Sequence, residues 1–372
     1  MPTLRRTRVV LVAVLAAAAL LSAPRLHAAA DTLPAKLSDQ EFWRLINDLS
    51  EDNGYFRSDN LLSNEIGFQT VIPDLVSRTK PGGVYLGVGP EQNFTYITAL
   101  KPKIVFITDI RRGNLHTQLM YKALFELAAD RADFMSRLFT KKRPAGLTLQ
   151  SSAHEIQQAF WDAATSDEAT YRTNLQAIDD VLTKKHEWPL VKEDLDGIEY
   201  VYHSFYWFGP RITYNSSSGT GQGNGNFVSY ADLMEATDNA GVARSFLANE
   251  ENYKFMKDLE SKNLLVPLVG NFAGPKALRG VARYLKDRGA VVTAFYLSNV
   301  EQYLNQDGIW NNFCANVAAM PLDASSTFIR SGQGGGGGRG GGLMSYLGNM
   351  QAETRGCGVV SRTPGGASGD HM

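Results

Sequence analysis

Two glycines and an aspartate have the types and the spacing of a nucleoside-binding site. Gly87 and Gly89 close a short apolar run, and Asp109 closes a second apolar run twenty residues after Gly89. Glycines at the end of a strand let a ligand approach the backbone, and a carboxylate at the end of the next strand can accept hydrogen bonds from both ribose hydroxyls. The pattern therefore predicts a strand–helix–strand unit that binds a nucleoside.

The same turn argues against a phosphorylated ligand. Gln92 stands where a dinucleotide-binding turn has its third glycine, and Pro90 removes one backbone N–H donor. Glu91 puts a negative charge where a pyrophosphate would meet the start of a helix. These features disfavour NAD, FAD and ATP and favour a phosphate-free cation, such as S-adenosylmethionine. The simpler alternative is a strand–turn–helix in which Asp109 only caps the next helix.

The unit resembles the first two motifs of class I S-adenosylmethionine-dependent methyltransferases. The longer stretch from about residue 37 to 304 resembles a family of uncharacterised exported proteins with a methyltransferase-like core. The phrases that carry this second resemblance are residues 59–65, 108–112 and 295–301. The chain departs from true methyltransferases in having Tyr85 before the first glycine, Glu91 in place of the third, and no Asn-Pro-Pro-aromatic motif.

The resemblance implies an α/β domain with an open, mostly parallel, Rossmann-like sheet and S-adenosylmethionine as the cofactor. It implies that residues 59–65 fold over the ligand, although such a polar segment is also typical of a helix-capping turn. We expect Gly87 and Gly89 to contact the amino-acid part of the ligand. Glu91 is expected near its ammonium group, and Asp109 on its ribose. Candidates for the adenine or the substrate are Asn64, Glu65, Asn271 and Ser298.

Two functions of different classes fit these features. One is a methyltransferase whose acceptor and catalytic residues the sequence does not identify, since methyl transfer needs mainly proximity and alignment. The other is an exported non-catalytic module that binds another small molecule or a protein partner. A hydrolase is disfavoured because the chain has no Gly-x-Ser-x-Gly motif.

The first thirty residues predict an export signal. Three arginines within residues 5–8 precede an uncharged run over residues 9–22, and three alanines at 28–30 offer a cleavage site. The run is shorter than the ~20 residues of a membrane span, so we expect a cleaved, periplasmic or secreted protein without a stable span. Cleavage leaves 33 basic and 38 acidic residues, a balance that does not suggest a nucleic-acid partner, so the expected partner is the small-molecule ligand.

Two groups of elements are expected to position the site. Apolar periodicity predicts helices over residues 39–49, capped by Ser38, and over residues 115–127. The helix-rich stretch from 113 to 185 is longer than an ordinary crossover, so we interpret it as partly an inserted cap. Residues 263–297 predict a second unit, in which a strand, a helix from Pro275 that stops at Gly289, and another strand form a right-handed parallel unit.

An aromatic segment, residues 199–210, predicts a strand buried on both faces. The alternative is a pocket lining with His203 as a base. No Cys/His group has zinc-ligand spacing, so no metal site is predicted.

The C-terminal part is expected to lie outside the folded domain of residues 31–330. The glycine-rich residues 331–342 predict a linker, and residues 343–372 a flexible tail with one or two helical turns at 343–350. A chain without residues 331–372 should then keep most of its stability. Cys314 and Cys357 either pair, as an oxidising compartment permits, or remain thiols.

Overall fold

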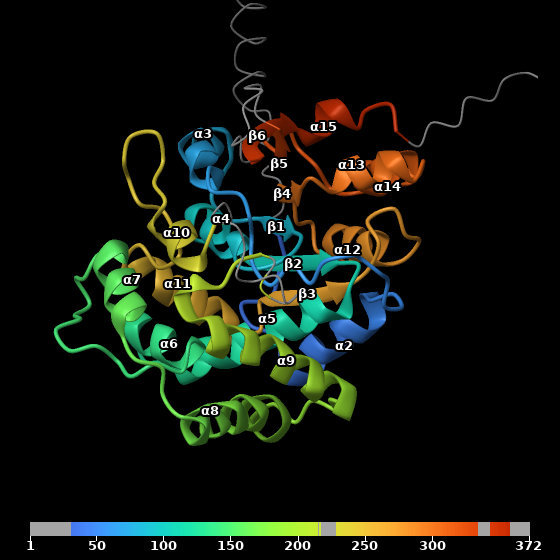
Figure 1. Cartoon of the computed structure of the whole chain (residues 1–372). Helices are drawn as coiled ribbons and strands as arrows, with labels where there is room; N and C mark the ends of the chain where they lie inside the picture. Colours follow the sequence, from blue (N-terminus) through green and yellow to red (C-terminus); the bar gives the residue numbers. More distant parts are fainter. Residues whose placement is uncertain (1–30, 215, 217–227, 334–342, 358–372) are drawn as a thin grey trace, which may run out of the picture. The chain divides into compact units, whose positions relative to one another are not determined.

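The computed structural model describes residues 31–214, 216, 228–333 and 343–357 (Figure 1). The expected leader, residues 1–30, lies outside this part, as do residues 334–342 of the glycine tract and residues 358–372 of the expected tail. The predictions made for those segments stay predictions.

Six strands form one sheet in the order β3-β2-β1-β4-β5-β6. The first five strands run parallel, and β6 runs antiparallel to β5. The predicted α/β class with an open, mostly parallel sheet is therefore confirmed. The strands are β1 (Val84–Gly87), β2 (Ile104–Asp109), β3 (Leu265–Val269), β4 (Val292–Ser298), β5 (Thr327–Gln333) and β6 (Leu343–Asn349).

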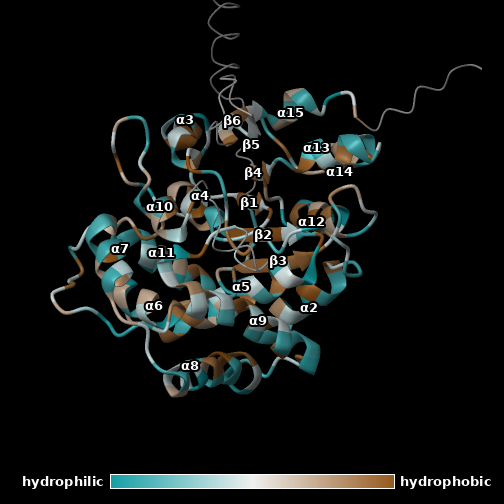
Figure 2. Ribbon diagram, in the orientation of Figure 1, coloured by the Kyte–Doolittle hydropathy of each residue, from teal (hydrophilic) through white to brown (hydrophobic). Residues whose placement is uncertain are grey.

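Helices cover both faces of the sheet, and the strand residues are mostly hydrophobic (Figure 2) and buried. On one face Tyr85 of β1 donates to Asn93 of α4 (Gln92–Leu100) at 2.9 Å. On the other face Phe106 of β2 packs edge-on against Tyr284 of α12 (Ala277–Lys286), with 5.7 Å between ring centroids. Figure 1 shows α4 and α12 on opposite sides of the stacked strands.

The predicted first helix and second unit are present. Ser38 caps α2 (Asp39–Leu49) in a capping box with Glu41. In the second unit α12 connects β3 to β4, and Gly289 has φ +62° after the helix end. The helix begins two residues later than Pro275, at Ala277, and β2 and β1 lie between the two parallel strands of the unit.

The helical region between β2 and β3 is longer than predicted. It extends from Arg112 to Ser261 rather than from 113 to 185, with α5 (Arg112–Leu127) packed against β3. The further helices of this region are α6 (Arg131–Leu138), α7 (Ala153–Asp162), α8 (Glu168–Asp180) with a π-helical turn (Val181–Lys185), α9 (Lys192–Phe208), α10 (Tyr230–Glu235) and α11 (Glu250–Ser261). Outside it lie α3 (Ile72–Arg78), α13 (Val300–Gln306), α14 (Trp310–Ala318) and α15 (Met350–Glu353).

The strand predicted over residues 199–210 is wrong, because these residues form the second half of α9 and the turn after it. Burial follows a helical period: Val201 and Phe205 are in the core, whereas Trp207 is 69% exposed. Aromatic density hid this period, since large rings occur on both faces of the helix. His203 is exposed and does not line the cavity described below, so it is no base there.

The predicted boundary at residue 330 is also wrong. β5 continues to Gln333, and residues 343–349 form β6 instead of helical turns. The following residue, Met350, is fully buried, and Cys357 forms a disulfide with Cys314 of α14, with Cα atoms 5.5 Å apart. The C-terminal segment up to Cys357 is therefore part of the fold.

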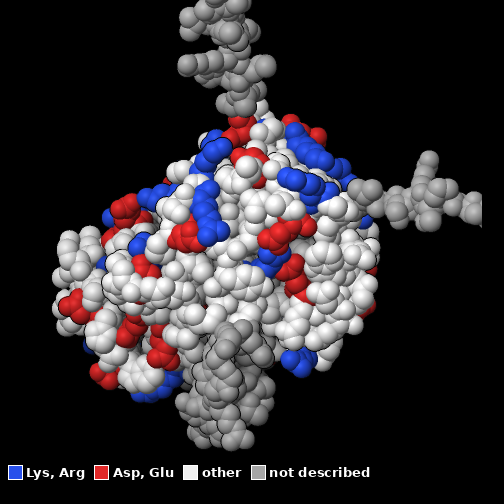
Figure 3. Space-filling view, turned by 90° about the horizontal axis from the view of Figure 1, so that it is seen from above, with Lys and Arg blue, Asp and Glu red and all other residues white. Residues whose placement is uncertain are grey.

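On the face seen in Figure 3, acidic and basic side chains are interspersed rather than segregated. No helix of the described part combines the length and the apolar character needed to cross a bilayer. Within the same residues, no three His, Cys, Asp or Glu side chains are grouped so that they could hold a metal ion.

Candidate functional site

A cavity of about 210 Å³ lies where the carboxyl ends of β1, β2, β3 and β4 meet. Parallel strands bring their ends to one edge of the sheet, so loops that are distant in sequence share this space. Asn60 and residues 62–65, from the polar segment before β1, line the cavity as well. The strand-end residues that line it are Val88, Gly89 and Pro90 after β1, Asp109 and Ile110 at the end of β2, Gly270, Asn271 and Phe272 after β3, and Ser298, Asn299 and Val300 at the end of β4.

The structure brings most of the candidate residues to this cavity. The ones that line it are Gly89, Asp109, Asn64, Glu65, Asn271 and Ser298. Gly87 and Glu91 are not among the lining residues.

Gly87 serves the turn instead of a ligand. The Asn93 amide nitrogen donates to the carbonyl oxygens of Val88 at 2.9 Å and Pro90 at 2.7 Å, and so holds the turn together. A methyl group on residue 87 would overlap the Asn93 amide oxygen. Gly89 differs, because its φ of +74° favours glycine and the space beside its Cα is open. Sequence reasoning missed Asn93, whose only signal was its place in the first turn of the helix.

Glu91 is buried beneath the turn and ties to it residues 59–65, which we call the covering segment. One carboxylate oxygen accepts from the Ser63 N–H at 3.2 Å, and the other has no hydrogen-bond partner in the described part of the chain. Burial in this environment raises the pKa of Glu91 from 4.5 to about 7. The group is therefore partly protonated near neutral pH.

Replacement of Glu91 by Gln is expected to change how stability depends on pH. The raised pKa means that the folded protein favours the protonated form of Glu91. The stability that Glu91 contributes is therefore fully present below about pH 4.5 and is lost as the pH rises through about 7. The loss is about 3 kcal/mol for a shift of this size. Glu91→Gln keeps an oxygen for Ser63 and removes the titration.

Urea unfolding of both proteins from pH 5 to pH 8 measures this difference. The variant should gain stability over wild type as the pH rises, by up to about 3 kcal/mol. A difference that does not vary with pH would show that Glu91 titrates normally.

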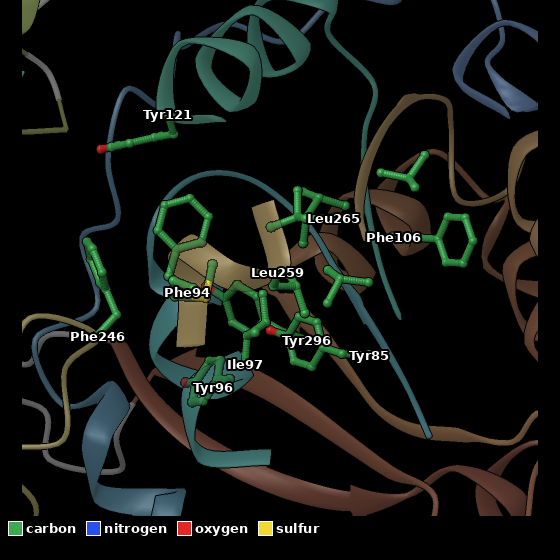
Figure 4. Packing of buried hydrophobic residues seen from close by; sticks show 14 of the residues in the cluster. Tyr85, Phe94, Tyr96, Ile97, Phe106, Tyr121, Phe246, Leu259, Leu265 and Tyr296 are labelled. Carbon is green, nitrogen blue, oxygen red and sulfur yellow. The ribbon is translucent and has the colours of Figure 1, made fainter. Parts of the chain in front are cut away.

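Glu65 lines the cavity but is occupied by protein donors. Its carboxylate accepts from Tyr296 Oη at 2.9 Å, from Gln92 Nε2 at 2.9 Å, from Ser298 Oγ at 2.6 Å and from Ser331 Oγ. A carboxylate has about four acceptor sites, so little capacity remains for a ligand. The rings of Tyr96 and Tyr296, with 5.3 Å between their centroids, belong to the buried cluster drawn in Figure 4. Glu65 thus anchors the covering segment to α4, β4 and β5.

Asp109 keeps one carboxylate oxygen for the cavity. Oδ1 accepts from the Arg111 N–H at 2.9 Å and lies 3.5 Å from Arg111 Nε. Burial raises the pKa of Asp109, and the Arg111 charge opposes that rise. The N-cap of α5 is Arg111, so the simpler alternative, in which Asp109 caps that helix, is wrong.

The remaining lining supplies aromatic faces and amides. The rings of Phe56 and Tyr303 meet edge to face, with 5.1 Å between their centroids. Tyr55, which also lines the cavity, is 84% exposed. Asn271 uses its oxygen to accept from Ala273 N–H, which leaves its amide N–H groups for a ligand. The charged lining residues of the described part are all acidic, namely Glu65, Asp109 and Asp307. Sequence reasoning missed the aromatic residues, which carry no motif.

One comparison with known proteins adds to this geometry. A family model described as "Domain of unknown function (DUF7790)" matches residues 61–339. The match includes every strand-end residue of the cavity and begins after Tyr55 and Phe56. No curated protein matches the chain.

Proposed function

We propose that this chain, which belongs to the family described as "Domain of unknown function (DUF7790)", is a methyltransferase-type, Rossmann-like protein. In this proposal it binds S-adenosylmethionine or a related nucleoside. The ligand occupies the cavity at the carboxyl ends of β1 to β4. The observation that carries the proposal is Asp109, which ends β2 beside the Gly89 turn and whose Oδ2 has no hydrogen-bond partner among the described residues. A carboxylate at this place can accept from both ribose hydroxyls.

The strand order supports the Rossmann-like part of the proposal. The order 3-2-1-4-5-6 is that of doubly wound nucleotide-binding sheets, whose ligands bind where the order reverses. Here the reversal lies between β1 and β4, and the ends of both strands line the cavity. The antiparallel β6 departs from an all-parallel sheet.

Charge and ring chemistry support a phosphate-free cation. An acidic lining attracts a sulfonium or an ammonium and repels phosphate. The rings of Phe56 and Tyr303 offer flat faces for an adenine. The Cys314–Cys357 disulfide is typical of an oxidising compartment, and it supports the proposal that the protein is exported.

Calorimetric titration tests the nucleoside site directly. We expect S-adenosylmethionine and S-adenosylhomocysteine to bind the purified chain, and ATP and NADH to bind far more weakly. If neither sulfur nucleoside binds, the nucleoside site is wrong, and the non-catalytic module becomes the better hypothesis.

A further inference from the structure

A second hollow lies beside the cavity and shares Ser298 and Asn299 with it. This hollow, which we call the amide groove, has a volume of about 550 Å³. Its other side chains include Glu301, Gln302 and Asn305 at α13, Trp310 at the start of α14 and Tyr346 of β6. Ligands in the two hollows would meet at Ser298.

Ser298 is held in an unusual conformation at this meeting point. Its φ is +50°, which is uncommon for a residue other than glycine, and the pairing of β4 with β5 shifts register between Tyr296 and Ser298. Strained residues and irregular pairing persist where surrounding contacts fix them, and they concentrate at functional sites. The bond from Ser298 Oγ to Glu65 at 2.6 Å supplies such a contact.

The amide groove carries no uncompensated charge among its described lining residues. Its one carboxylate, Glu301, pairs with Arg330, whose Nη2 lies 3.2 Å from Oε1. Glu301 also accepts from the Trp310 indole N–H at 3.2 Å, which fixes the orientation of that ring. The groove therefore suits a neutral ligand better than a phosphate or a polyanion.

Amides and rings define the chemistry of that ligand. The side-chain amides of Asn299 and Gln302 have no hydrogen-bond partner within the described residues, and each can both donate and accept. Trp310 and the half-exposed Tyr346 add aromatic faces. Hydroxyl groups need donors and acceptors together, and aromatic faces cover the C–H surface of a sugar ring.

We propose that the amide groove binds a neutral saccharide. β5 pairs with β4 only as far as Arg330, so Ser331 and Gly332 of the groove pair with β6 alone. A peptide that adds a strand at this edge is therefore the alternative that the test must exclude. That the saccharide is a second ligand, held beside the nucleoside at Ser298, rests on the proposed function. Saccharide binding to the groove itself is independent of the nucleoside site.

Saturation-transfer NMR and calorimetry with neutral trisaccharides test the proposal on the full chain. The probes are maltotriose, cellotriose, mannotriose and chitotriose, with a neutral Gly-Ser peptide as the comparison. The variants are Gln302→Ala and Tyr346→Ala, which truncate exposed side chains of the groove. The matched control is Trp207→Ala, an exposed ring outside both hollows.

We expect at least one trisaccharide to bind wild type and the control equally, and each groove variant about tenfold more weakly. S-adenosylhomocysteine should bind all of these proteins alike. If S-adenosylhomocysteine binds and no trisaccharide does, the saccharide proposal fails and the nucleoside site stands. Equal saccharide binding by the groove variants, or peptide binding as strong as that of the saccharides, also overturns it.

Discussion

A chain truncated after Arg330 is expected to lose its cooperative fold. The truncation removes the end of β5, the whole of β6, the buried Met350 and the disulfide partner Cys357. The disulfide closes a loop of 43 residues, which is worth about 4 kcal/mol in the chain-entropy account. Because domains are stable by only about 5–15 kcal/mol, this loss together with β6 leaves little stability.

Thermal unfolding followed by circular dichroism measures the effect. We expect the melting temperature to fall by tens of degrees, or the cooperative transition to disappear. A chain that ends at Cys357 is the matched control, since it keeps all of these contacts. If the truncated chain melts within a few degrees of the control, β6 and the disulfide contribute little to stability and this expectation is wrong.

The error at the C-terminus has a physical cause. β6 is a short segment that follows a glycine-rich tract, and its own sequence has no strong period. Its structure depends on pairing with β5 and on the Cys314–Cys357 bond. Neither contact can be deduced from a local pattern.

What the sequence predicted well depended on local signals. Apolar runs, glycine turns and capped helices predicted the strand–helix–strand units that contain β1 and β4. The same kind of pattern predicted that Asp109 ends β2. The network of Glu65 could not be predicted in this way. Its partners Gln92, Tyr296 and Ser331 lie 27, 231 and 266 residues away, so tertiary structure alone brings them together.

Replacement of Asp109 by Ala is expected to weaken binding of S-adenosylmethionine by roughly ten- to a hundredfold. The free carboxylate oxygen would accept from ribose hydroxyls, and a hydrogen bond to a charged group contributes about 1.5–3 kcal/mol. Because burial raises the pKa of Asp109, wild-type affinity should also fall as pH is lowered through that pKa. Protonation of the carboxyl group removes acceptor capacity from the oxygen that would otherwise accept from the two hydroxyls.

Two further variants separate the ribose contact from other effects. Asp109→Asn keeps an oxygen for the Arg111 N–H but removes the charge beside the Arg111 guanidinium, so its thermal melting should fall less than that of Asp109→Ala while its affinity falls. Asp307→Ala removes another lining carboxylate, on the exposed side of the cavity. An equal loss of affinity in Asp307→Ala would mean that Asp109 acts only through its charge. Affinity unchanged in both Asp109 variants would exclude the ribose contact, because no other carboxylate ends β2 beside the Gly89 turn.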